Sequence, residues 1–436
     1  MSKIYGIDLG TTNSLLGLND TLLTGLVPSV VDLSTGKAGK SEYENMSAVR
    51  SFKIDISLFK EGEMSIAASA RVLRQLVKES GQDVKEVVIS VPAYFSDNQR
   101  QATIKAAELA GLTVRGLVNE PTAAAIYASR SRRALSLVFD LGGGTFDVTV
   151  VDSRFGDYDV QATDGCILGG DNFDAAIRQW LIKHANLKMF HYPPEELQRL
   201  KWECCRAKIE LQKTQQPVNI DCTRWGAGVA VLTPETYVEI MKHVFAPAIQ
   251  KAKMVWAESI PQGEPCDIIL VGGSTRCPYL QRWVAEEFRQ EPVEMFYDPD
   301  KIVALGACAY AQMVADGKVT TMVSDVTKAL SIAMSDGTSK TIIPRNSKVP
   351  AEETTIAYNN IESDRIDLLL CQGDSILWKD NEVIGKLTYN YGQTMPAGEG
   401  EVIIGIRIDA NGTIHFSCKE LGKAPVQVVL DRTKSS

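Results

Sequence analysis

Leu137–Asp147 reads LVFDLGGGTFD, and Ile4–Ser14, near the start of the chain, reads IYGIDLGTTNS. In each stretch a short apolar run ends in Asp-Leu-Gly and enters a turn rich in glycine and threonine. Apolar residues resume soon afterwards, at Leu15–Leu18 and at Val148–Val151. This pattern predicts a strand, a tight turn and a second strand. Its repetition within one chain indicates two similar halves.

Each copy places an aspartate, Asp8 or Asp140, where a buried strand reaches the edge of its sheet. Carboxylate oxygens in that position suit Mg²⁺, usually through its waters. The glycine that comes next lets the backbone approach a phosphate, and successive N–H groups with threonine hydroxyls form an anion nest. A single copy would be explained more simply as a glycine turn between core strands. Two copies favour a phosphate held from both sides.

A third glycine loop, LVGGSTR at Leu270–Arg276, again follows an apolar strand and precedes a helix. Its backbone at Gly272 and Gly273 could approach a flat base or a ribose. Alone, it would be an ordinary strand-to-helix turn. As the third member of a set, it predicts the nucleoside side of the same site.

Alternating strands and helices fill the chain up to about residue 317. The predicted strands are Val87–Val91, Thr113–Val118 and Asp267–Val271. The predicted helices are Asp97–Ala110 with Ser96 as N-cap, Glu120–Ala128, Phe173–Leu187, Glu195–Gln212, Pro234–Glu258, Pro278–Phe288 and Asp300–Val314. This alternation is typical of an α/β domain.

The texture changes from Asp325 onward, where short alternating runs replace the helices. These runs are Arg365–Cys371, Glu401–Ile408, Thr413–Cys418 and Val426–Leu430, and Asn411-Gly412 is a strong hairpin signal. We therefore expect three parts: an α/β domain at 1–317, a linker at 318–326 and a β-sandwich at 327–436.

Composition excludes several classes of protein. The chain has 436 residues and a net charge of −8, which argues against binding nucleic acid or an anionic membrane. No apolar run reaches the ~20 residues of a spanning helix, and the N-terminus carries no signal core, so we expect a cytoplasmic protein without membrane contact. Nine cysteines without a C-x-x-C pair predict reduced, mostly buried thiols, and four histidines without ligand spacing argue against a zinc site.

Seven motifs in order carry a family resemblance: IYGIDLGTTNS, VVISVPAYFSDNQRQAT, AGLTVRGLVNEPTAAAIYA, LVFDLGGGTFDV, ILGGDNFD, IILVGGSTR and DPDKIVALGA. Together they resemble the nucleotide-binding domain of DnaK-type heat-shock chaperones, the heat-shock protein 70 family. The likeness covers Ile4 to about Leu18 and Val87 to Gln312. PRNSKVP, QGD, DNEVIGK and IDANGTIHFS resemble, more loosely, that family's β-sandwich substrate module.

The resemblance implies a fold and an activity. The fold would be a two-lobed, actin-like ATPase domain, a duplicated ribonuclease-H-like fold, followed by a β-sandwich that binds substrate. The activity would be that of an ATP-dependent chaperone in protein folding, with Mg²⁺ and ATP or ADP in the cleft and weak hydrolysis to ADP and phosphate. Its partners would be unfolded or extended apolar peptide segments, a J-domain cochaperone and a nucleotide exchange factor.

Carried over residue by residue, the resemblance also implies a site. Asp8 and Asp140 would surround the metal, and Asp140, Thr145, Asp147 and Glu120 would be catalytic, the last two near the attacking water. The nucleotide would be held by Gly10, Thr11, Thr12, Asn13, Gly142, Gly143, Gly144, Thr145, Gly169, Gly170, Lys208, Gly272, Gly273, Ser274, Arg276 and Asp300. For Lys208, an ordinary solvated helix charge is an equal alternative. Peptide would meet Met334, Ile366 and Leu368, for which plain sandwich core is an equal alternative.

Departures from the family pattern set further expectations. Only 58 residues separate Pro28 from Val87, so the upper subdomain of the first half should be trimmed. The family's catalytic lysine lies in that segment, where GKAGK offers Lys37 or Lys40 without a convincing match. The linker Val319–Thr327 has few large apolar residues, and the chain stops after the sandwich, so we expect weak coupling between the domains and no helical lid.

Two other functions stay open on the sequence alone. The unplaced lysine and the weak linker favour a nucleotide-binding scaffold or sensor with little or no hydrolysis. A sugar or acyl kinase of the same superfold is a third possibility, but no separate sugar-binding segment is present and the C-terminal β domain would be unexplained.

Overall fold

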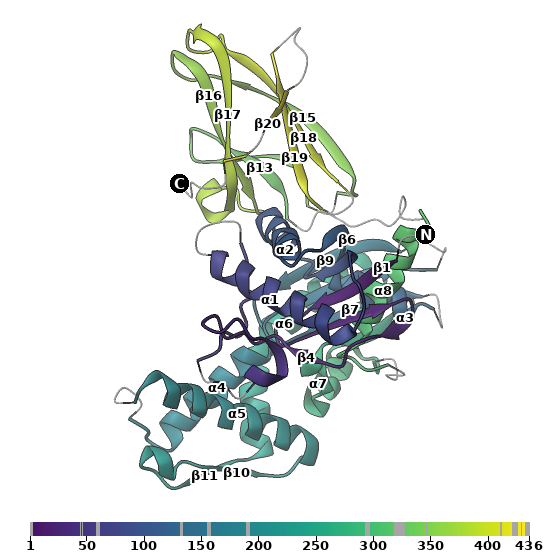
Figure 1. Ribbon diagram of the computed structural model, residues 1–436, viewed down its shortest axis with the longest axis vertical. Helices are drawn as coiled ribbons and strands as arrows, with labels where there is room; N and C mark the ends of the chain where they lie inside the picture. Colours follow the sequence, from purple (N-terminus) through teal and green to yellow (C-terminus); the bar gives the residue numbers. More distant parts are fainter. Residues whose placement is uncertain are drawn as a thin grey trace.

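Two mixed sheets, one built on each Asp-Leu-Gly unit, form the body of the computed structural model (Figure 1). The structure describes residues 3–43, 45, 47–57, 62–130, 134–154, 158–188, 192–292, 297–317, 328–345, 347–409, 412–420, 426–428 and 430–431. The predicted linker at 318–326 lies outside these residues. No helix among them is long and apolar enough to cross a membrane.

The first sheet has the strand order β3-β2-β1-β5-β6, with β4 paired to β2. Its strands are β1 (Ile4–Leu9), β2 (Asn13–Leu18), β3 (Thr21–Leu22), β4 (Val27–Pro28), β5 (Glu86–Val91) and β6 (Thr113–Asn119). β1 and β2 form an antiparallel hairpin, whereas β5 and β6 continue parallel to β1. Helices α1 (Glu63–Ser80) and α2 (Asp97–Leu109) share a hydrophobic core with this sheet.

The second sheet repeats the plan in the order β12-β7-β8-β9. Its strands are β7 (Leu135–Leu141), β8 (Phe146–Asp152), β9 (Asp159–Cys166) and β12 (Asp267–Val271). β7 and β8 form the antiparallel hairpin, and β12 runs parallel to β7. The predicted duplication is therefore present in the strand pairing of both halves.

Two helices lie between the halves. α3 (Glu120–Ala128) and α8 (Ile302–Ala315) bury small residues in a core that reaches both sheets. Ile4 and Val88 enter this core from the first sheet, and Val138 and Val271 enter it from the second. The α3–α8 layer therefore packs against the sheets of both halves.

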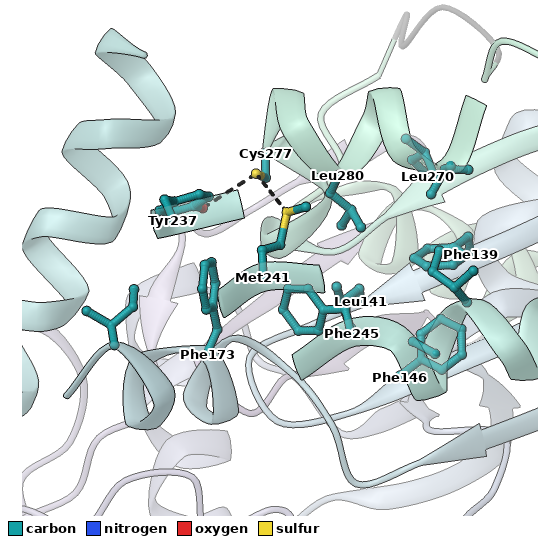
Figure 2. Close-up of a cluster of buried hydrophobic side chains, with 14 of the residues drawn as sticks. Phe139, Leu141, Phe146, Phe173, Tyr237, Met241, Phe245, Leu270, Cys277 and Leu280 are labelled. Atoms are coloured by element: carbon teal, nitrogen blue, oxygen red, sulfur yellow. Dashed lines mark hydrogen bonds between the residues drawn. The ribbon is translucent and has the colours of Figure 1, made fainter. Parts of the chain in front are cut away.

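A larger core supports the second half (Figure 2). It packs the sheet against α4 (Gly170–His184), α5 (Pro194–Thr214), α6 (Pro234–Ser259) and α7 (Pro278–Phe288), with the hairpin β10 (Val218–Asp221) and β11 (Val229–Leu232) beyond them. Phe173 of α4 lies edge-on to Tyr237 and Phe245 of α6, with ring centroids 4.8 and 5.5 Å apart. This aromatic cluster packs the first turn of α4 against α6, while the backbone N–H groups of Gly170 and Asp171 donate to the carbonyl oxygens of Gly142 and Gly143 in the second Asp-Leu-Gly turn.

The C-terminal part is a sandwich of two four-stranded sheets, β14-β13-β16-β17 and β15-β18-β19-β20. Its strands are β13 (Leu330–Ala333), β14 (Ser339–Ile343), β15 (Ala351–Tyr358), β16 (Ser363–Gln372), β17 (Glu382–Met395), β18 (Glu401–Ile408), β19 (Ile414–Lys419) and β20 (Val426–Val428). One core fills the space between the sheets. Short 3₁₀ turns elsewhere are η1 (Gly39–Glu42), η4 (Thr223–Trp225), η5 (Gly273–Arg276) and η7 (Trp378–Asp380).

The sandwich packs against the first turn of α2 and against β9 (Figure 1). The backbone N–H of Asp97 donates to Gln372 Oε1 at 3.0 Å, and Asp97 Oδ1 accepts from the N–H of Ile414 at 2.9 Å. On β9, Arg345 donates to the carbonyl oxygen of Thr163 at 2.7 Å. The sandwich therefore meets elements of both halves.

Candidate functional site

The two Asp-Leu-Gly turns face each other at close range. A Cβ added to Gly143 would lie 2.0 Å from Thr12 Oγ1, and one on Gly144 would lie 2.9 Å from the Thr11 side chain. Because no side chain fits at these two positions, glycine is what allows the turns to approach. The predicted opposition of the two loops is present in the structure.

A cavity of about 840 Å³ opens between the turns, within the usual range for small-molecule sites. Most of the predicted site residues line it: Asp8, Gly10, Thr11, Thr12, Asn13, Glu120, Asp140, Gly142, Gly143, Thr145, Gly170, Lys208, Gly272, Gly273, Ser274 and Asp300. Gly144, Asp147, Gly169 and Arg276 are not among the residues that line it. Gly144 and Gly169 instead pack behind the turn, and a Cβ on Gly169 would meet the backbone of Gly143 at 2.6 Å.

Four buried or half-buried carboxylates converge beside the turns: Asp8, Glu120, Asp140 and Asp147. Burial, followed by the charge of Glu120, raises the pKa of Asp8 to about 6, although Lys53 and a 2.7 Å hydrogen bond from Ser90 oppose the rise. Burial and the neighbouring carboxylates raise the pKa of Asp140 well above its ordinary value. Such crowding of acids is relieved by a cation, so the donor set suits Mg²⁺.

Asp147 lies deeper, on β8. Burial and the charge of Glu120 raise its pKa well above the ordinary value, while the backbone N–H groups of Tyr94 and Ala93 oppose the rise. Its Oδ2 is buried and has no hydrogen-bond partner among the described residues, which leaves one acceptor for a water.

No three His, Cys, Asp or Glu side chains of the described chain converge to chelate a metal by themselves. Any Mg²⁺ here would therefore need oxygens from water or from a phosphate.

Lys53 supplies positive charge at the centre of the site. Its ammonium group is ion-paired with Glu120, and the exposed fractions of the two side chains are 4% and 10%. Lys53 also lines the cavity. The sequence offered Lys37 or Lys40 for this role, but both are exposed and neither lines the cavity. The lysine that the structure brings to the carboxylates is therefore Lys53.

A local signal could have found Lys53. SFKIDI (Ser51–Ile56) alternates buried apolar residues with a charge, and Phe52 and Ile56 are both almost fully buried. Burial of a lysine ammonium group costs free energy unless a carboxylate pairs with it. A lysine among core side chains therefore indicates a buried ion pair. Because the segment between Pro28 and Val87 is shorter than in the family pattern, Lys53 could not be matched to the family's catalytic lysine from the sequence.

The far end of the cavity carries the third glycine loop. Ser274 Oγ donates to the carbonyl oxygen of Gly142 at 2.9 Å, which ties this loop to the second turn. A Cβ on Gly273 would lie 2.7 Å from Asp300 Oδ1, so the backbone there is in close contact with Asp300. Arg276 pairs with Asp298 and Asp300 rather than facing the cavity.

Lys208 lies inside the cleft and is not a solvated helix charge. Only 12% of its side chain is exposed, and its ammonium group lies 2.6 Å from Asp174 Oδ1. Burial acts to lower the pKa of Lys208, but Asp174, Cys205 and Asp171 together outweigh burial and the pKa is raised. A charged amine held beside Gly170 is suited to an anionic or hydroxyl-bearing ligand.

An aromatic and cationic contact bridges the two walls of the cavity. Tyr43, from the trimmed segment of the first half, lies 5.5 Å from Trp202 of α5, centroid to centroid. The guanidinium of Arg50 lies 5.6 Å from the Tyr43 ring and 5.5 Å from the Trp202 ring. Nearby, Ser51 Oγ donates to the carboxylate of Asp171 at the start of α4. We call Tyr43, Arg50 and Trp202 the clasp; the sequence analysis missed it.

The three predicted peptide-binding residues have different surroundings. Ile366 is 5% exposed and belongs to the sandwich core, and Leu368 is half-buried against that core. The core alternative therefore describes Ile366. Met334 is 40% exposed, so its side chain is available to a ligand.

Comparisons with known proteins agree with this arrangement. The family profile described as Hsp70 protein matches residues 47–434. The chaperone protein DnaK of Mycoplasma mycoides subsp. mycoides is 34% identical to this chain, over 96% of it and 78% of the relative. The chaperone protein DnaK of Mycoplasmoides gallisepticum is 32% identical (96% and 78%), and that of Akkermansia muciniphila is 29% identical (98% and 77%). The chain belongs to the Hsp70 family.

Proposed function

We propose that this protein is a molecular chaperone that binds Mg-ATP between its two Asp-Leu-Gly turns, hydrolyses it slowly and binds short extended apolar peptide segments in its β-sandwich. The observation that carries the proposal is the convergence of both turns, four carboxylates and Lys53 on one cavity. Family membership supports the chaperone part. In this reading residues 1–317 are a two-lobed, actin-like domain, 318–326 are the linker and 327–436 bind peptide.

The residues of the cavity would divide the work. Gly10–Asn13 and Gly142–Thr145 would cradle the phosphates with backbone N–H groups and hydroxyls. Asp8 and Asp140 would hold Mg²⁺, which neutralises phosphate charge when bound. Glu120 and Asp147 would orient the attacking water, and the ammonium of Lys53 would stabilise negative charge that develops on the phosphoryl oxygens. Gly170, Lys208 and Gly272–Ser274 would frame the nucleoside.

The buried position of Lys53 favours turnover over a scaffold without hydrolysis. The scaffold hypothesis rested on an unplaced lysine and a weak linker, and a paired lysine beside Glu120 removes the first of these two arguments. Because the lysine is held by Glu120, its position is set before any ligand arrives. Electrostatic stabilisation depends on such preorganisation.

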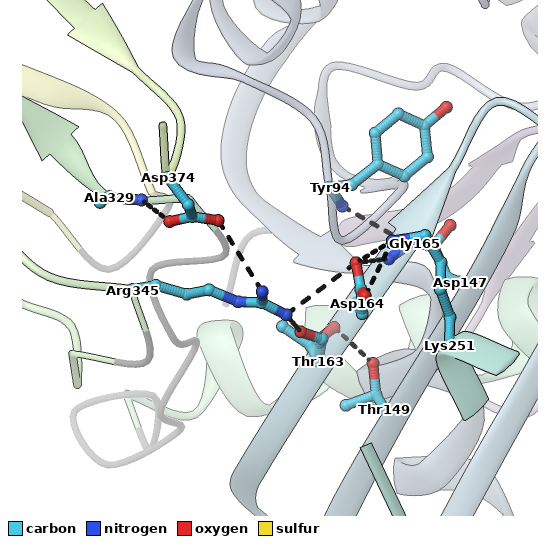
Figure 3. A network of polar contacts seen from close by, with 10 residues as sticks. All are labelled: Tyr94, Asp147, Thr149, Thr163, Asp164, Gly165, Lys251, Ala329, Arg345 and Asp374. Carbon is cyan, nitrogen blue, oxygen red and sulfur yellow. Dashed lines mark hydrogen bonds and ion pairs between the residues drawn. The ribbon is translucent and has the colours of Figure 1, made fainter. Parts of the chain in front are cut away.

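A polar network connects the site to the sandwich (Figure 3). Asp147 pairs with Gly165 across β8 and β9, and the neighbouring Asp164 accepts from Lys251 at 2.8 Å. Arg345 of the sandwich lies 3.9 Å from the same Asp164 and 3.8 Å from Asp374. Nucleotide binding that moves Asp147 would therefore also move β9, which Arg345 of the sandwich contacts. This connection supports the proposal that bound nucleotide changes the affinity of the sandwich for peptide.

A second route runs through α2. Arg100 donates to Asn119 Oδ1 at 2.7 Å, and Asn119 directly precedes Glu120. The same helix begins at Asp97, which holds Gln372 and Ile414 of the sandwich. We therefore propose that the α/β domain and the β-sandwich are coupled through these direct contacts between them. A J-domain cochaperone and an exchange factor are the proposed protein partners.

Calorimetric titration with Mg-ATP tests the premise. We expect binding at micromolar concentrations, and no heat up to about 1 mM would remove the proposal. Single-turnover hydrolysis then separates a chaperone ATPase from a scaffold: a rate at the no-protein background, with ATP bound, favours the scaffold. The variant Asp140→Asn should lower the rate about 100-fold, because a metal-holding carboxylate at the site of transfer is lost. An unchanged rate would contradict the role given to Asp140.

A further inference from the structure

A second cavity lies apart from the nucleotide cleft, on the outer side of the trimmed segment. It measures about 510 Å³ and is lined by Gly36, Lys37, Ala38, Ser41, Arg71, Arg74, Gln75 and Lys78. Half of these residues are cations and none is acidic. Lys37, which the sequence offered as a catalytic lysine, belongs to this cavity.

Helix α1 displays the cations as one row. Arg71, Arg74 and Lys78 are spaced three and four residues apart, so they share a face of the helix. The opposite face carries Val72, Leu73 and Leu76 into the core, so the row cannot turn away from the surface without unpacking the helix. The charged face is therefore a fixed feature of the fold.

The loop opposite α1 is shaped around this row. Gly36 has φ +75°, a conformation that favours glycine, and a Cβ there would lie 2.0 Å from Arg71 Nη1, so a larger residue would displace the guanidinium. The guanidinium of Arg74 is held by a hydrogen bond that it donates to the carbonyl oxygen of Leu109, at the end of α2. The arginines therefore line a formed cavity.

These charges lack the partners that cations have elsewhere in the molecule. Arg115, Arg154 and Arg224, for example, each pair with a carboxylate. Within the described ranges, no carboxylate forms an ion pair with Lys37, Arg71, Arg74 or Lys78. Glu79 is nearby, but it accepts a hydrogen bond from Gln75 at 2.9 Å. In a chain of net charge −8, a concave cluster of unpaired cations has the character of an anion site.

The shape of the cluster selects among anions. Arg71 and Lys78 are seven residues apart, a rise of roughly 10 Å along the helix, so a single phosphate would reach only part of the row. No aromatic or large apolar side chain lines the cavity on which a base could stack. Carboxylates on alternate residues of an extended peptide are roughly 7 Å apart, a spacing that the long side chains of Arg71 and Lys78 reach by leaning toward each other. An arginine guanidinium binds one carboxylate through two parallel hydrogen bonds.

We propose that this cavity is a docking site for an acidic, extended peptide segment of a partner protein. The carboxylates of such a segment would pair with Arg71 and Lys78, with Lys37 closing over it from the loop. The site is separate from the nucleotide cleft and from the sandwich, so a partner could dock here whatever occupies either.

The test uses the full chain and a fluorescein-labelled ten-residue peptide of alternating aspartate and serine, followed by fluorescence anisotropy without nucleotide. We expect saturable binding that weakens as salt screens the charges. The double variant Arg71→Glu/Lys78→Glu should bind at least about tenfold more weakly. The matched control is Lys85→Glu/Lys105→Glu, which makes the same change in net charge at two exposed lysines outside the cavity, and it should change binding less than about twofold.

Three outcomes would overturn the proposal. These are the absence of saturable binding, equal weakening in the two double variants, and displacement of the peptide by inorganic phosphate at the concentration at which unlabelled peptide displaces it. Thermal unfolding checks that both variants fold. If the charge-reversed variant does not fold, Lys37→Gln/Lys78→Gln replaces it, because both lysines are exposed; an unchanged affinity for the peptide would then refute the site.

Discussion

The two Asp-Leu-Gly hairpins share one backbone plan but carry different charges. In the first, Asp8 pairs across the hairpin with Leu15; in the second, Asp140 pairs with Asp147. The second hairpin thus contributes two buried carboxylates and the first only one. This difference explains why Asp147 is among the groups that raise the pKa of Asp140 but not among those that act on Asp8. The two hairpins therefore share their strand pairing but differ in their electrostatics.

The segments downstream of the two hairpins also differ. After β2 the chain makes two short strands and the trimmed segment, which returns Lys53 to the site. After β8 it makes β9, where Arg345 of the sandwich donates to the carbonyl oxygen of Thr163. The first half therefore supplies the central cation, and the second supplies the extra acid and one connection to the sandwich. Three predictions test this division.

The largest expected effect comes from removing the cation of the first half. Lys53→Met leaves Glu120 buried without its partner, a loss of about 3–5 kcal/mol in the free energy of unfolding. Hydrolysis should fall about 100-fold, because charge stabilisation of the transferring phosphoryl group is lost. Chemical denaturation and single-turnover hydrolysis measure the two effects.

Lys40→Met is the matched control, since Lys40 is exposed in the same segment. It should leave both quantities unchanged. If Lys40→Met lowered the hydrolysis rate and Lys53→Met did not, the assignment of the lysine would be wrong. A double variant Lys53→Met/Glu120→Gln should regain stability without regaining hydrolysis, because it removes the unpaired charge but not the need for a cation.

Elements whose sequence signals are local were predictable in both halves. α3, α7 and β12 begin and end as predicted, with Pro121 and Pro278 in the first turns of the two helices. Ser96 precedes α2 as predicted, and its N–H donates to Gln99 Oε1 at 3.1 Å. Turn glycines, caps and helix-start prolines act within a few residues, so they can be recognised without the fold.

The segment between β4 and β5 was harder to predict because its decisive contacts are distant in sequence. Helix α1 was missed although Ile66, Leu73 and Leu76 mark its buried face. Lys53 meets Glu120 across 67 positions, and Tyr43 meets Trp202 across an even longer stretch of chain. Such contacts depend on how the halves pack together, which no local pattern specifies.

Removing the contact between the sandwich and β9 should have a smaller effect than removing Lys53. Arg345→Ala deletes the hydrogen bond to Thr163 and the pairs with Asp164 and Asp374. Peptide affinity, measured by anisotropy with a labelled apolar peptide, should lose most of its response to Mg-ATP, about tenfold or 1–2 kcal/mol of coupling. Affinity for Mg-ATP itself should change little. Undiminished coupling would leave α2 as the route between site and sandwich, and Asp97→Ala would then be the variant to measure.

The smallest predicted effect concerns the clasp, where the two halves touch across the mouth of the cavity. Trp202→Ala removes the ring that Tyr43 and Arg50 contact, interactions worth about 0.5–1.5 kcal/mol each when partly buried. Release of a fluorescent ADP analogue in stopped-flow should therefore accelerate about threefold to tenfold, and Trp202→Phe should restore most of the slow release.

A contact between Trp202 and the base would also speed release, so a ligand without a base is needed to separate the two roles. Release of tripolyphosphate should accelerate by the same factor in Trp202→Ala if the ring closes the cavity, and should be unchanged if the ring only stacks on adenine. Because the clasp joins the trimmed segment to α5, equal acceleration by Tyr43→Ala would show that both halves hold the cavity closed. Acceleration by Trp202→Ala alone would assign the closure to the second half.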